Sequence, residues 1–308
     1  MPADLAILYE HPSWFEPLFA ALDRRGIAYD KLLLTDHSFD PGHGTPPAPV
    51  ILSRVAMSGF LREPDHGIFY AEALLDHWQR QGARVLNGAQ VIAFDSSKAR
   101  QLSLIASLGL AIPRTRVVHR ARDLVAAARG MPFPLLVKAN IGGSGAGIVR
   151  YDALSELEQA VAQRSVPDSI DKALLLQDYV PAQGGTILRV ETLAGRYLYA
   201  LEVESRADSF DLCPADACLA TPGRAAIRMK AVTPPEEIVT AAERIARAAG
   251  LDIGGVEVVI DERDGTPRFY DINALSNFVA NPLDVIGWDP HDRLIDHLEV
   301  AIGSKAGS

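Results

Sequence analysis

The sequence predicts an α/β protein of about two domains. Short apolar runs, typical of buried parallel strands, alternate with segments of helical spacing through the first third of the chain. The 308 residues accommodate two domains at roughly 150 residues each. Hydrophobic residues make up 48% and charged residues 22%, a globular balance that excludes a disordered chain, a collagen-like repeat and a coiled coil.

Residues 1–95 predict an open α/β domain because strand and helix signals alternate along them. The apolar runs that we expect to form strands are 5–9, 29–34, 50–53 and 83–86. Helical spacing of apolar residues predicts helices over 15–25 and 70–81. Each of these helices is followed by a glycine, Gly26 or Gly82, a residue that commonly ends helices.

After residue 95 the elements become more mixed. Ser96 or Ser97 can cap a helix that runs from Lys98 to Leu108. Further strands are expected after Pro113 and over 135–138, 148–151, 173–177 and 188–203, with helices over 123–129 and 155–163. Thr233 to Glu236 forms a capping-box pattern with proline at the first helical position, which predicts a helix to Gly250. Strands at 256–260 and 268–273 flank an Asp-Gly turn, which is a hairpin signal.

Charge and cysteine content narrow the classes of partner. The net charge is −9, and the sequence has no dense Lys/Arg run, which argues against nucleic acid as a partner. The two cysteines, Cys213 and Cys218, are too few for a disulfide framework or a structural zinc site, so we expect ordinary thiols. The apolar run at the N-terminus is too short for a signal peptide or a membrane span. We therefore expect a soluble, cytoplasmic chain that does not bind membranes.

A glycine-rich run, KANIGGSGAG, follows the strand that ends at Lys138. Glycines let backbone N–H groups approach phosphate oxygens closely, although a glycine-rich hairpin turn is an equally ordinary use of such a run. The run leads into another strand, so it is neither the strand–loop–helix of a dinucleotide site nor a P-loop. Lys138 stands where its ammonium could reach a phosphate.

The predicted hairpin places two carboxylates and an amide together. With a turn centred on Asp264-Gly265, Glu257 lies opposite Asp271. Tyr270 and Ile272 then form the alternate apolar face, while Asn273 shares the face of Asp271. Paired carboxylates with a neutral amide suit Mg²⁺ or Mn²⁺ bound to nucleotide phosphates. An ordinary solvated hairpin face is the alternative.

The segment 174–181, LLLQDYVP, is an apolar strand that ends in a polar and aromatic pair. Such a strand end can line a planar base through its backbone groups. An ordinary core strand is the alternative.

Taken in order, these motifs resemble the ATP-grasp superfamily, and within it the branch of ribosomal-protein glutamate ligase-like enzymes. The stretches that carry the resemblance are SSKARQLSLIASLGLAIPRT, PLLVKANIGGSGAGI, LLLQDYVP, ILRVETLAGR and GGVEVVIDERDGTPRFYDIN. The resemblance implies a Rossmann-like domain at 1–95 and a two-lobed ATP-grasp domain at 96–302. It divides the latter into a mobile nucleotide-covering lobe, about 130–183, and a C-terminal lobe with the metal hairpin at 184–302.

The resemblance also implies roles for single residues. Lys98 and Lys138 match the lysines that contact the phosphates of ATP, and Arg189 matches a basic residue near the phosphate or acyl-phosphate site. The remaining residues it assigns form three groups: a loop over the triphosphate (Gly142, Gly143, Ser144, Gly145, Gly147), a hinge whose backbone reads adenine (Gln177, Asp178, Tyr179, Val180), and ligands for paired magnesium ions (Glu257, Asp271, Asn273).

Two departures from the family pattern occur. The first metal strand carries Glu and the second Asp-x-Asn, where the family more often has Asp and Glu-x-Asn. The segment SFDLCPAD, 209–216, replaces a substrate segment rich in Arg, Asn and His. We therefore look for the substrate carboxylate at arginines outside the ATP core, with Arg54, Arg206 and Arg228 as candidates and solvated surface arginines as the alternative.

The activity implied by the resemblance is ATP-dependent ligation of a carboxylate to an amine through an acyl phosphate, with release of ADP and phosphate. The partners would be a small-molecule carboxylate and an amine, amino acid or peptide-like, and a homo-oligomer is compatible with the sequence. The alternatives are ATP-grasp chemistry with a non-amine acceptor and a nucleotide-binding regulator without turnover.

Overall fold

The computed structural model describes most of the chain. The described residues are 3–42, 44–62, 65–143, 145–204 and 228–306. Ser144, Arg206, both cysteines and the divergent segment 209–216 therefore lie outside them. Among the described helices, none combines the length and the hydropathy needed to cross a bilayer.

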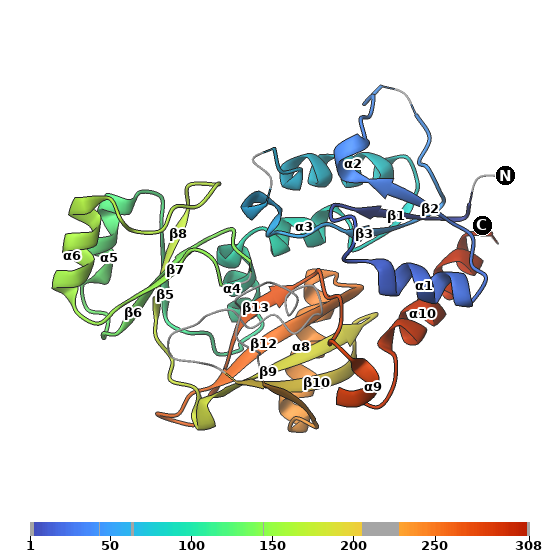
Figure 1. Cartoon of the computed structure of the whole chain (residues 1–308). Helices are drawn as coiled ribbons and strands as arrows, with labels where there is room; N and C mark the ends of the chain where they lie inside the picture. The colour runs from blue at the N-terminus through green and yellow to red at the C-terminus, as the bar shows by residue number, and fades with distance from the viewer. Residues whose placement is uncertain (1–2, 43, 63–64, 144, 205–227, 307–308) are drawn as a thin grey trace.

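The N-terminal part is a parallel sheet covered by helices on both faces (Figure 1). Its strand order is β2-β1-β3-β4, with β1 Leu5–Tyr9, β2 Tyr29–Leu33, β3 Val50–Arg54 and β4 Arg84–Leu86. Helix α1 (Glu16–Arg24) packs on one face, and α2 (Ile68–Arg80) packs on the other. The predicted strands and helices are confirmed here to within two residues at each end, because their apolar runs and glycine stops are local signals.

A small antiparallel sheet follows, and its helices cover one face only. Its order is β5-β8-β6-β7, with β5 Thr115–Val118, β6 Leu135–Ala139, β7 Ile148–Tyr151 and β8 Leu174–Asp178. Helices α5 (Leu124–Ala128) and α6 (Leu154–Gln163) share a core with alternate strand residues. Figure 1 shows both helices on the outer side of this lobe. The face opposite these helices carries Lys138 and Gln177, and both side chains are buried.

The C-terminal part is built on a five-stranded antiparallel sheet of order β11-β10-β9-β12-β13. Its strands are β9 Thr186–Leu193, β10 Arg196–Glu204, β11 Met229–Val232, β12 Ile253–Ile260 and β13 Pro267–Asn273. The apolar stretch predicted over 188–203 is a hairpin, because Ala194 and Gly195 both adopt positive φ and turn the chain between β9 and β10.

Helices α3 (Ala89–Asp95), α4 (Lys98–Ser107) and α8 (Glu236–Ala249) cover one face of this sheet. The capping-box prediction is wrong, since α8 starts at Glu236 after Pro235 and no side chain caps it. The cap at Ser97 is confirmed, because its side chain accepts the N–H of Arg100. Helix α3 is absent from the sequence prediction, as its seven residues are too few for a helical period to stand out.

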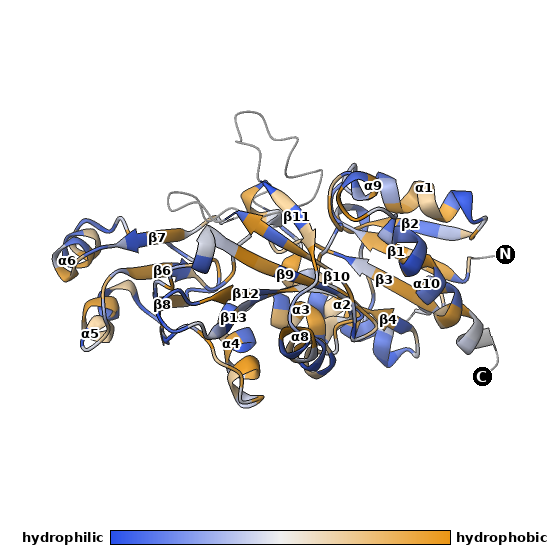
Figure 2. Cartoon of the chain, turned by 90° about the horizontal axis from the view of Figure 1, so that it is seen from below, coloured by the Kyte–Doolittle hydropathy of each residue, from blue (hydrophilic) through white to orange (hydrophobic). Residues whose placement is uncertain are grey.

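The opposite face of the five-stranded sheet packs against the N-terminal sheet. Leu5 and Leu52 of the parallel sheet share one core with Leu201 and Ile253 of the antiparallel sheet. The C-terminal helix α10 (Pro290–Ala306), which follows the short α9 (Pro282–Val285), returns to lie beside α1 (Figure 1). Figure 2 shows hydrophobic residues along β3 and β12, two of the strands that meet at this junction. The junction therefore brings the strand ends of the first domain over the face that carries Glu257.

Candidate active site

The β12–β13 hairpin presents two carboxylates side by side. Glu257 pairs directly with Asp271, and Gly255 pairs with Asn273, so the predicted register is confirmed. The pairing then shifts, because Val258 pairs with Phe269, and Tyr270 is left as the extra residue of a bulge.

The bulge changes the face on which Tyr270 lies. The prediction that Tyr270 joins Ile272 on the apolar face is wrong: Ile272 packs under α8, whereas Tyr270 packs against the core on the opposite face. A bulge sets two consecutive residues against one, so Tyr270 and Asp271 both face Glu257. Burial and then the charge of Glu257 raise the pKa of the Tyr270 hydroxyl well above its usual value.

Lys98 reaches the hairpin from the first turn of α4. Its Nζ lies 2.5 Å from Oδ1 of Asp271. Burial alone would lower the pKa of Lys98, but the attraction of Asp271 outweighs it and raises the pKa above its usual value. The lysine is therefore charged and occupies the position of a counter-ion to the carboxylate pair.

Lys138 approaches the same hairpin from the small lobe. It is the next-to-last residue of the buried strand β6, and its Nζ lies 5.6 Å from the centre of the Tyr270 ring. Burial and then repulsion by Lys98 lower the pKa of Lys138 to about 8. The fold thus brings together two lysines, 40 residues apart in the sequence, that act on each other electrostatically.

Arg189, on β9, lies between a carboxylate of its own strand and a carboxylate of β12. Its Nε lies 2.6 Å from Oε1 of Glu191, and its Nη1 lies 3.3 Å from Oε1 of Glu257. The Asn273 amide donates to the same Glu257 oxygen at 3.2 Å. Burial and the Asp271 carboxylate raise the pKa of Glu257, while Arg189 and Lys98 oppose that rise.

Sequence reasoning missed two acidic residues of this cluster. Glu191 is fully buried and holds Arg189, and its Oε2 has no hydrogen-bond partner among the described residues. Asp95 ends α3, accepts the N–H of Ala274 at 3.2 Å, and has its pKa raised to about 7 by burial. The alternation of Arg189 and Glu191 on one strand face was the available signal for Glu191. Asp95 had none, because only the fold places it beside the hairpin.

The glycine loop starts from a firmly held position. Asn140 accepts the N–H of Ala99 at 2.9 Å and donates to Asp171, and Ile141 is buried in the N-terminal core. Gly147 adopts positive φ, and its carbonyl accepts the N–H of Ala139 at 2.8 Å. A Cβ on Gly143 would lie 2.7 Å from Cβ of Ser58, which shows how closely this loop approaches the N-terminal domain. The described residues of the predicted phosphate loop thus lie directly after the strand that carries Lys138.

The side chains of the predicted hinge are engaged by protein groups. Gln177 donates to the Thr115 hydroxyl at 2.9 Å, Asp178 pairs with Arg263, and the Tyr179 ring lies under the Arg150 guanidinium. The backbone of the hinge, in contrast, has hydrogen-bonding groups that are not paired. Within the described part of the chain, neither the Tyr179 carbonyl nor the Val180 N–H has a hydrogen-bond partner. In the described structure, the hydrogen-bonding groups that this segment leaves free are thus on its backbone.

Of the three candidate arginines, Arg54 lies close enough to Glu191 and Asp95 to interact with their charges. It is buried at the C-terminal end of β3, and its Nη2 donates to the Ser276 carbonyl and, at 3.2 Å, to Asn277. Its Nε and Nη1 have no partner among the described residues, and burial lowers the pKa of Arg54 to about 10. Arg228 is exposed beside β11, and Arg206 lies outside the described residues.

The described residues offer few side chains that could bind a metal ion. Among the residues that the structure describes, no group of three or more His, Cys, Asp and Glu could hold a metal ion. Two carboxylates with an amide are what the hairpin offers, an oxygen-donor set for a hard divalent cation.

Residues 95–280 match the family model of the RimK-like ATP-grasp domain, which covers more than half of the chain. The chain belongs to the RimK-like ATP-grasp family. The resemblance stated from the sequence is therefore confirmed. A probable alpha-L-glutamate ligase of Citrobacter koseri is 29% identical over 67% of this chain and 64% of its own length. A ribosomal protein bS6--L-glutamate ligase of Shigella boydii has the same identity and coverage.

The solved structure of another ATP-grasp protein matches this fold over nearly the full length of both chains. The ATP-grasp ligase PsnB, solved with a phosphomimetic precursor variant, Mg and ADP, has a TM-score of 0.71 at 15% identity. The match spans 98% of this chain and 99% of PsnB, which confirms the ATP-grasp fold class. This RimK-like chain spans about 64% of the length of the first curated relatives it matches.

Proposed function

We propose that this protein is an ATP-dependent carboxylate–amine ligase that works through an acyl phosphate. The observation that carries the proposal is the convergence of Lys98 and Lys138, from two separate elements, on the paired Glu257 and Asp271 carboxylates. Positive groups beside an oxygen-donor cation site suit the transfer of a charged phosphoryl group. The ligase names of the family relatives support the same reaction class.

ATP would lie between the small lobe and the hairpin. The Tyr179 carbonyl and the Val180 N–H would bond the adenine edge, and the two lysines would bind phosphate oxygens. The loop of Gly142, Gly143, Gly145 and Gly147 would cover the triphosphate with backbone N–H groups. Arg189 acts here by holding Glu257, since both carboxylates around it occupy its guanidinium.

Glu257, Asp271 and Asn273 fit magnesium. Their donors are oxygen atoms, and Lys98 and Arg189 now supply the positive charge that the carboxylate pair requires. Magnesium held there, as two ions by the family resemblance, would neutralise charge on the phosphate oxygens. The exchange of Glu and Asp between the two strands keeps the pair in direct register.

The reaction needs no nucleophilic side chain. A substrate carboxylate oxygen attacks the γ-phosphorus of ATP, the bond to the β–γ bridging oxygen breaks, and ADP leaves. The amine nitrogen then attacks the acyl carbon, the bond from that carbon to phosphate breaks, and the ammonium proton passes to solvent. Lys98 and Lys138 hold the phosphate oxygens in place and stabilise their charge.

The first domain would supply the carboxylate site. Arg54 has two buried N–H groups without a protein partner among the described residues, and such groups suit a carboxylate. It also stands at the C-terminal edge of a parallel sheet, where open α/β sheets bind ligands. We propose an amino acid or peptide-like substrate, with Arg206 and Arg228 as the other candidates for binding its carboxylate.

A turnover screen tests the proposal. Purified protein is incubated with MgATP and pools of carboxylates and amines, while ADP release and product mass are measured. We expect ADP release that requires both substrates, and Asp271→Asn should slow it at least about 100-fold. Asp264→Asn, an exposed carboxylate on the same hairpin, is the matched control and should retain activity.

The alternatives give different results in the same screen. ADP release with a carboxylate alone would indicate a non-amine acceptor. ATP binding without ADP release in any pool would indicate a nucleotide-binding regulator. An Arg54→Ala variant with unchanged KM for the carboxylate would remove Arg54 from the substrate site.

A further inference from the structure

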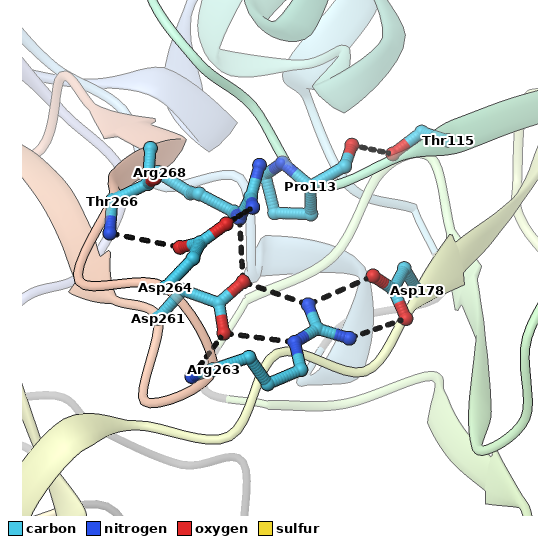
Figure 3. A network of polar contacts seen from close by, with 8 residues as sticks. All are labelled: Pro113, Thr115, Asp178, Asp261, Arg263, Asp264, Thr266 and Arg268. Atoms are coloured by element: carbon cyan, nitrogen blue, oxygen red, sulfur yellow. Dashed lines mark hydrogen bonds and ion pairs between the residues drawn. The ribbon is translucent and has the colours of Figure 1, made fainter.

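The turn of the β12–β13 hairpin reaches the end of the predicted hinge strand. Arg263, in this turn, donates from Nη2 to Oδ2 of Asp178 at 3.0 Å and from Nη1 to Oδ1 at 3.4 Å. Asp178 is the last residue of β8, 85 positions away in the sequence. Figure 3 shows the Arg263 guanidinium between the carboxylates of Asp178 and Asp261. We name these three residues the hinge clamp.

Asp261 fixes the direction in which Arg263 points. It is completely buried and accepts the backbone N–H of Arg263 at 3.0 Å and both Nε and Nη2 at 2.8 Å. Arg268 donates from Nε to Oδ2 of Asp261 at 2.7 Å, the same oxygen that accepts from Nη2 of Arg263. These hydrogen bonds hold the pKa of Asp261 well below its usual range, and the bond from the Arg263 side chain contributes most. Arg263 is thus held in one orientation before it meets Asp178.

Backbone contacts join the same two segments. The N–H of Glu262 donates to the Pro181 carbonyl at 2.9 Å, and Ala182 forms a bridge with Asp261. The hinge residues Tyr179 and Val180 therefore lie between two attachments, the clamp at Asp178 and the bridge at Ala182. Their position is fixed relative to the hairpin that carries Glu257 and Asp271.

We propose that Arg263 is a positioning residue for the nucleotide, which sets the hinge backbone at the distance and angle that adenine requires. This inference rests on the proposed function, since it assumes ATP in the site. Adenine presents an N6 donor beside its N1 acceptor, which matches a carbonyl followed by an N–H, whereas guanine presents an O6 acceptor. A displaced hinge would therefore weaken ATP binding and lower the preference for ATP over GTP.

The competing explanation is that the ion pairs only stabilise the turn. Arg268 serves that role, because it bonds Asp261 and Asp264 and, in the described structure, makes no contact with the hinge. The two arginines therefore offer matched variants: Arg263→Gln and Arg268→Gln remove the same charge from the same buried Asp261, and only Arg263→Gln frees the hinge.

The test measures direct binding of ATP and GTP by calorimetry, together with KM, kcat and the melting temperature. We expect Arg263→Gln to raise the Kd and KM for ATP about five-fold and to lower the ATP/GTP preference, with kcat unchanged. Arg268→Gln should lower the melting temperature at least as much and leave nucleotide binding within two-fold of wild type (about the size of an exposed ion-pair effect). Asp178→Ala should reproduce the Arg263→Gln effect, and the double variant should add nothing.

Equal effects of Arg263→Gln and Arg268→Gln on ATP binding would overturn the inference, as would wild-type binding in Arg263→Gln. A wild-type protein that binds no ATP would overturn the proposed function itself. The two failures are thus distinguished by the wild-type binding measurement alone.

Discussion

Most charged residues of this site form ion pairs with residues of opposite charge. Lys98 faces Asp271, and Arg189 lies between Glu191 and Glu257. Buried charges persist only when such partners compensate for lost hydration. Lys138 is the exception, because it is buried near a second lysine and makes no ion pair among the described residues. A phosphate would supply the missing partner.

The lowered pKa of Lys138 predicts a pH-dependent ATP affinity. A lysine is charged below its pKa, and the pKa of Lys138 in the free protein is about 8. As pH rises through that value the charge is lost, so kcat/KM for ATP should fall by up to about ten-fold per pH unit. The measurement is the pH profile of kcat/KM for ATP between pH 6.5 and 9.5 (roughly the range that brackets the lysine titration).

Lys138→Arg tests the assignment, since arginine stays charged and the alkaline fall should disappear. Lys172→Arg, an exposed lysine paired with Asp168, is the control and should keep the wild-type profile. A wild-type profile that stays flat to the alkaline limit would contradict the assignment of Lys138 to the phosphates.

At the scale of elements, one asparagine joins the two domains. Asn87 follows β4 with a φ of 50°, and its side chain donates to the carbonyls of Ile253 and Ala274 at 2.7 and 2.8 Å. Its Oδ1 accepts the N–H groups of Asp252 and Ile253 at 2.9 and 3.1 Å. The start of β12 and the end of β13 are therefore fixed to the first domain by a single buried side chain.

Asn87→Ala should lower the free energy of unfolding by at least about 3 kcal/mol, because buried backbone groups lose their partners. Urea denaturation measures this change. Asn87→Gly removes the same side chain, but glycine tolerates positive φ. This variant therefore separates the loss of hydrogen bonds from backbone strain, and it should be about 1 kcal/mol less destabilising than Asn87→Ala. Wild-type stability in both variants would show that the bridge contributes nothing.

At the scale of the whole molecule, one hydrophobic core contains residues from both sides of the predicted domain boundary at residue 95. Leu5 and Leu52 of the first domain share one cluster with Leu201 and Ile253 of the ATP-grasp sheet and with Leu294 of α10. Helix α10, the last element of the chain, packs beside α1, the first helix. Arg25 forms ion pairs with Asp296 and Glu299 of α10, and Arg24 pairs with Asp289, the residue before this helix.

This shared core predicts that the first domain and the C-terminal sheet unfold together. We expect one calorimetric transition for the pair, with calorimetric and van't Hoff enthalpies that agree. A fragment that begins at residue 96 should fail to fold alone, because it exposes the apolar face that β1 and β3 now cover. Two resolved transitions, one reproduced by that fragment, would falsify the shared-core interpretation.

Much of the fold could be predicted because its signals are local. Alternating apolar runs and glycine stops gave the strands and helices of the first domain, and a single Asp-Gly turn placed Glu257 opposite Asp271. The bulge at Tyr270 could not be predicted, because its extra residue depends on how β13 packs between α4 and β12 rather than on the turn. The capping box at Thr233 fails for a local reason. Pro234 precedes another proline, which disfavours helical backbone angles, and Pro235 itself is extended with ψ of 144°, so the helix begins only at Glu236.

The sequence by itself determined the family, and its Asp-Gly turn determined that Glu257 pairs with Asp271, because short motifs encode both. Only the tertiary structure decided that Asp95 bonds the end of that hairpin, that Glu191 and Arg54 interact through their charges, and that Arg263 bonds Asp178. Buried charges acquire their partners from strands and loops far apart in the chain, and such long-range pairing leaves no periodic pattern in the sequence. The same physical reason explains why Asn87 is one residue of a loop in the sequence and a junction between domains in the fold.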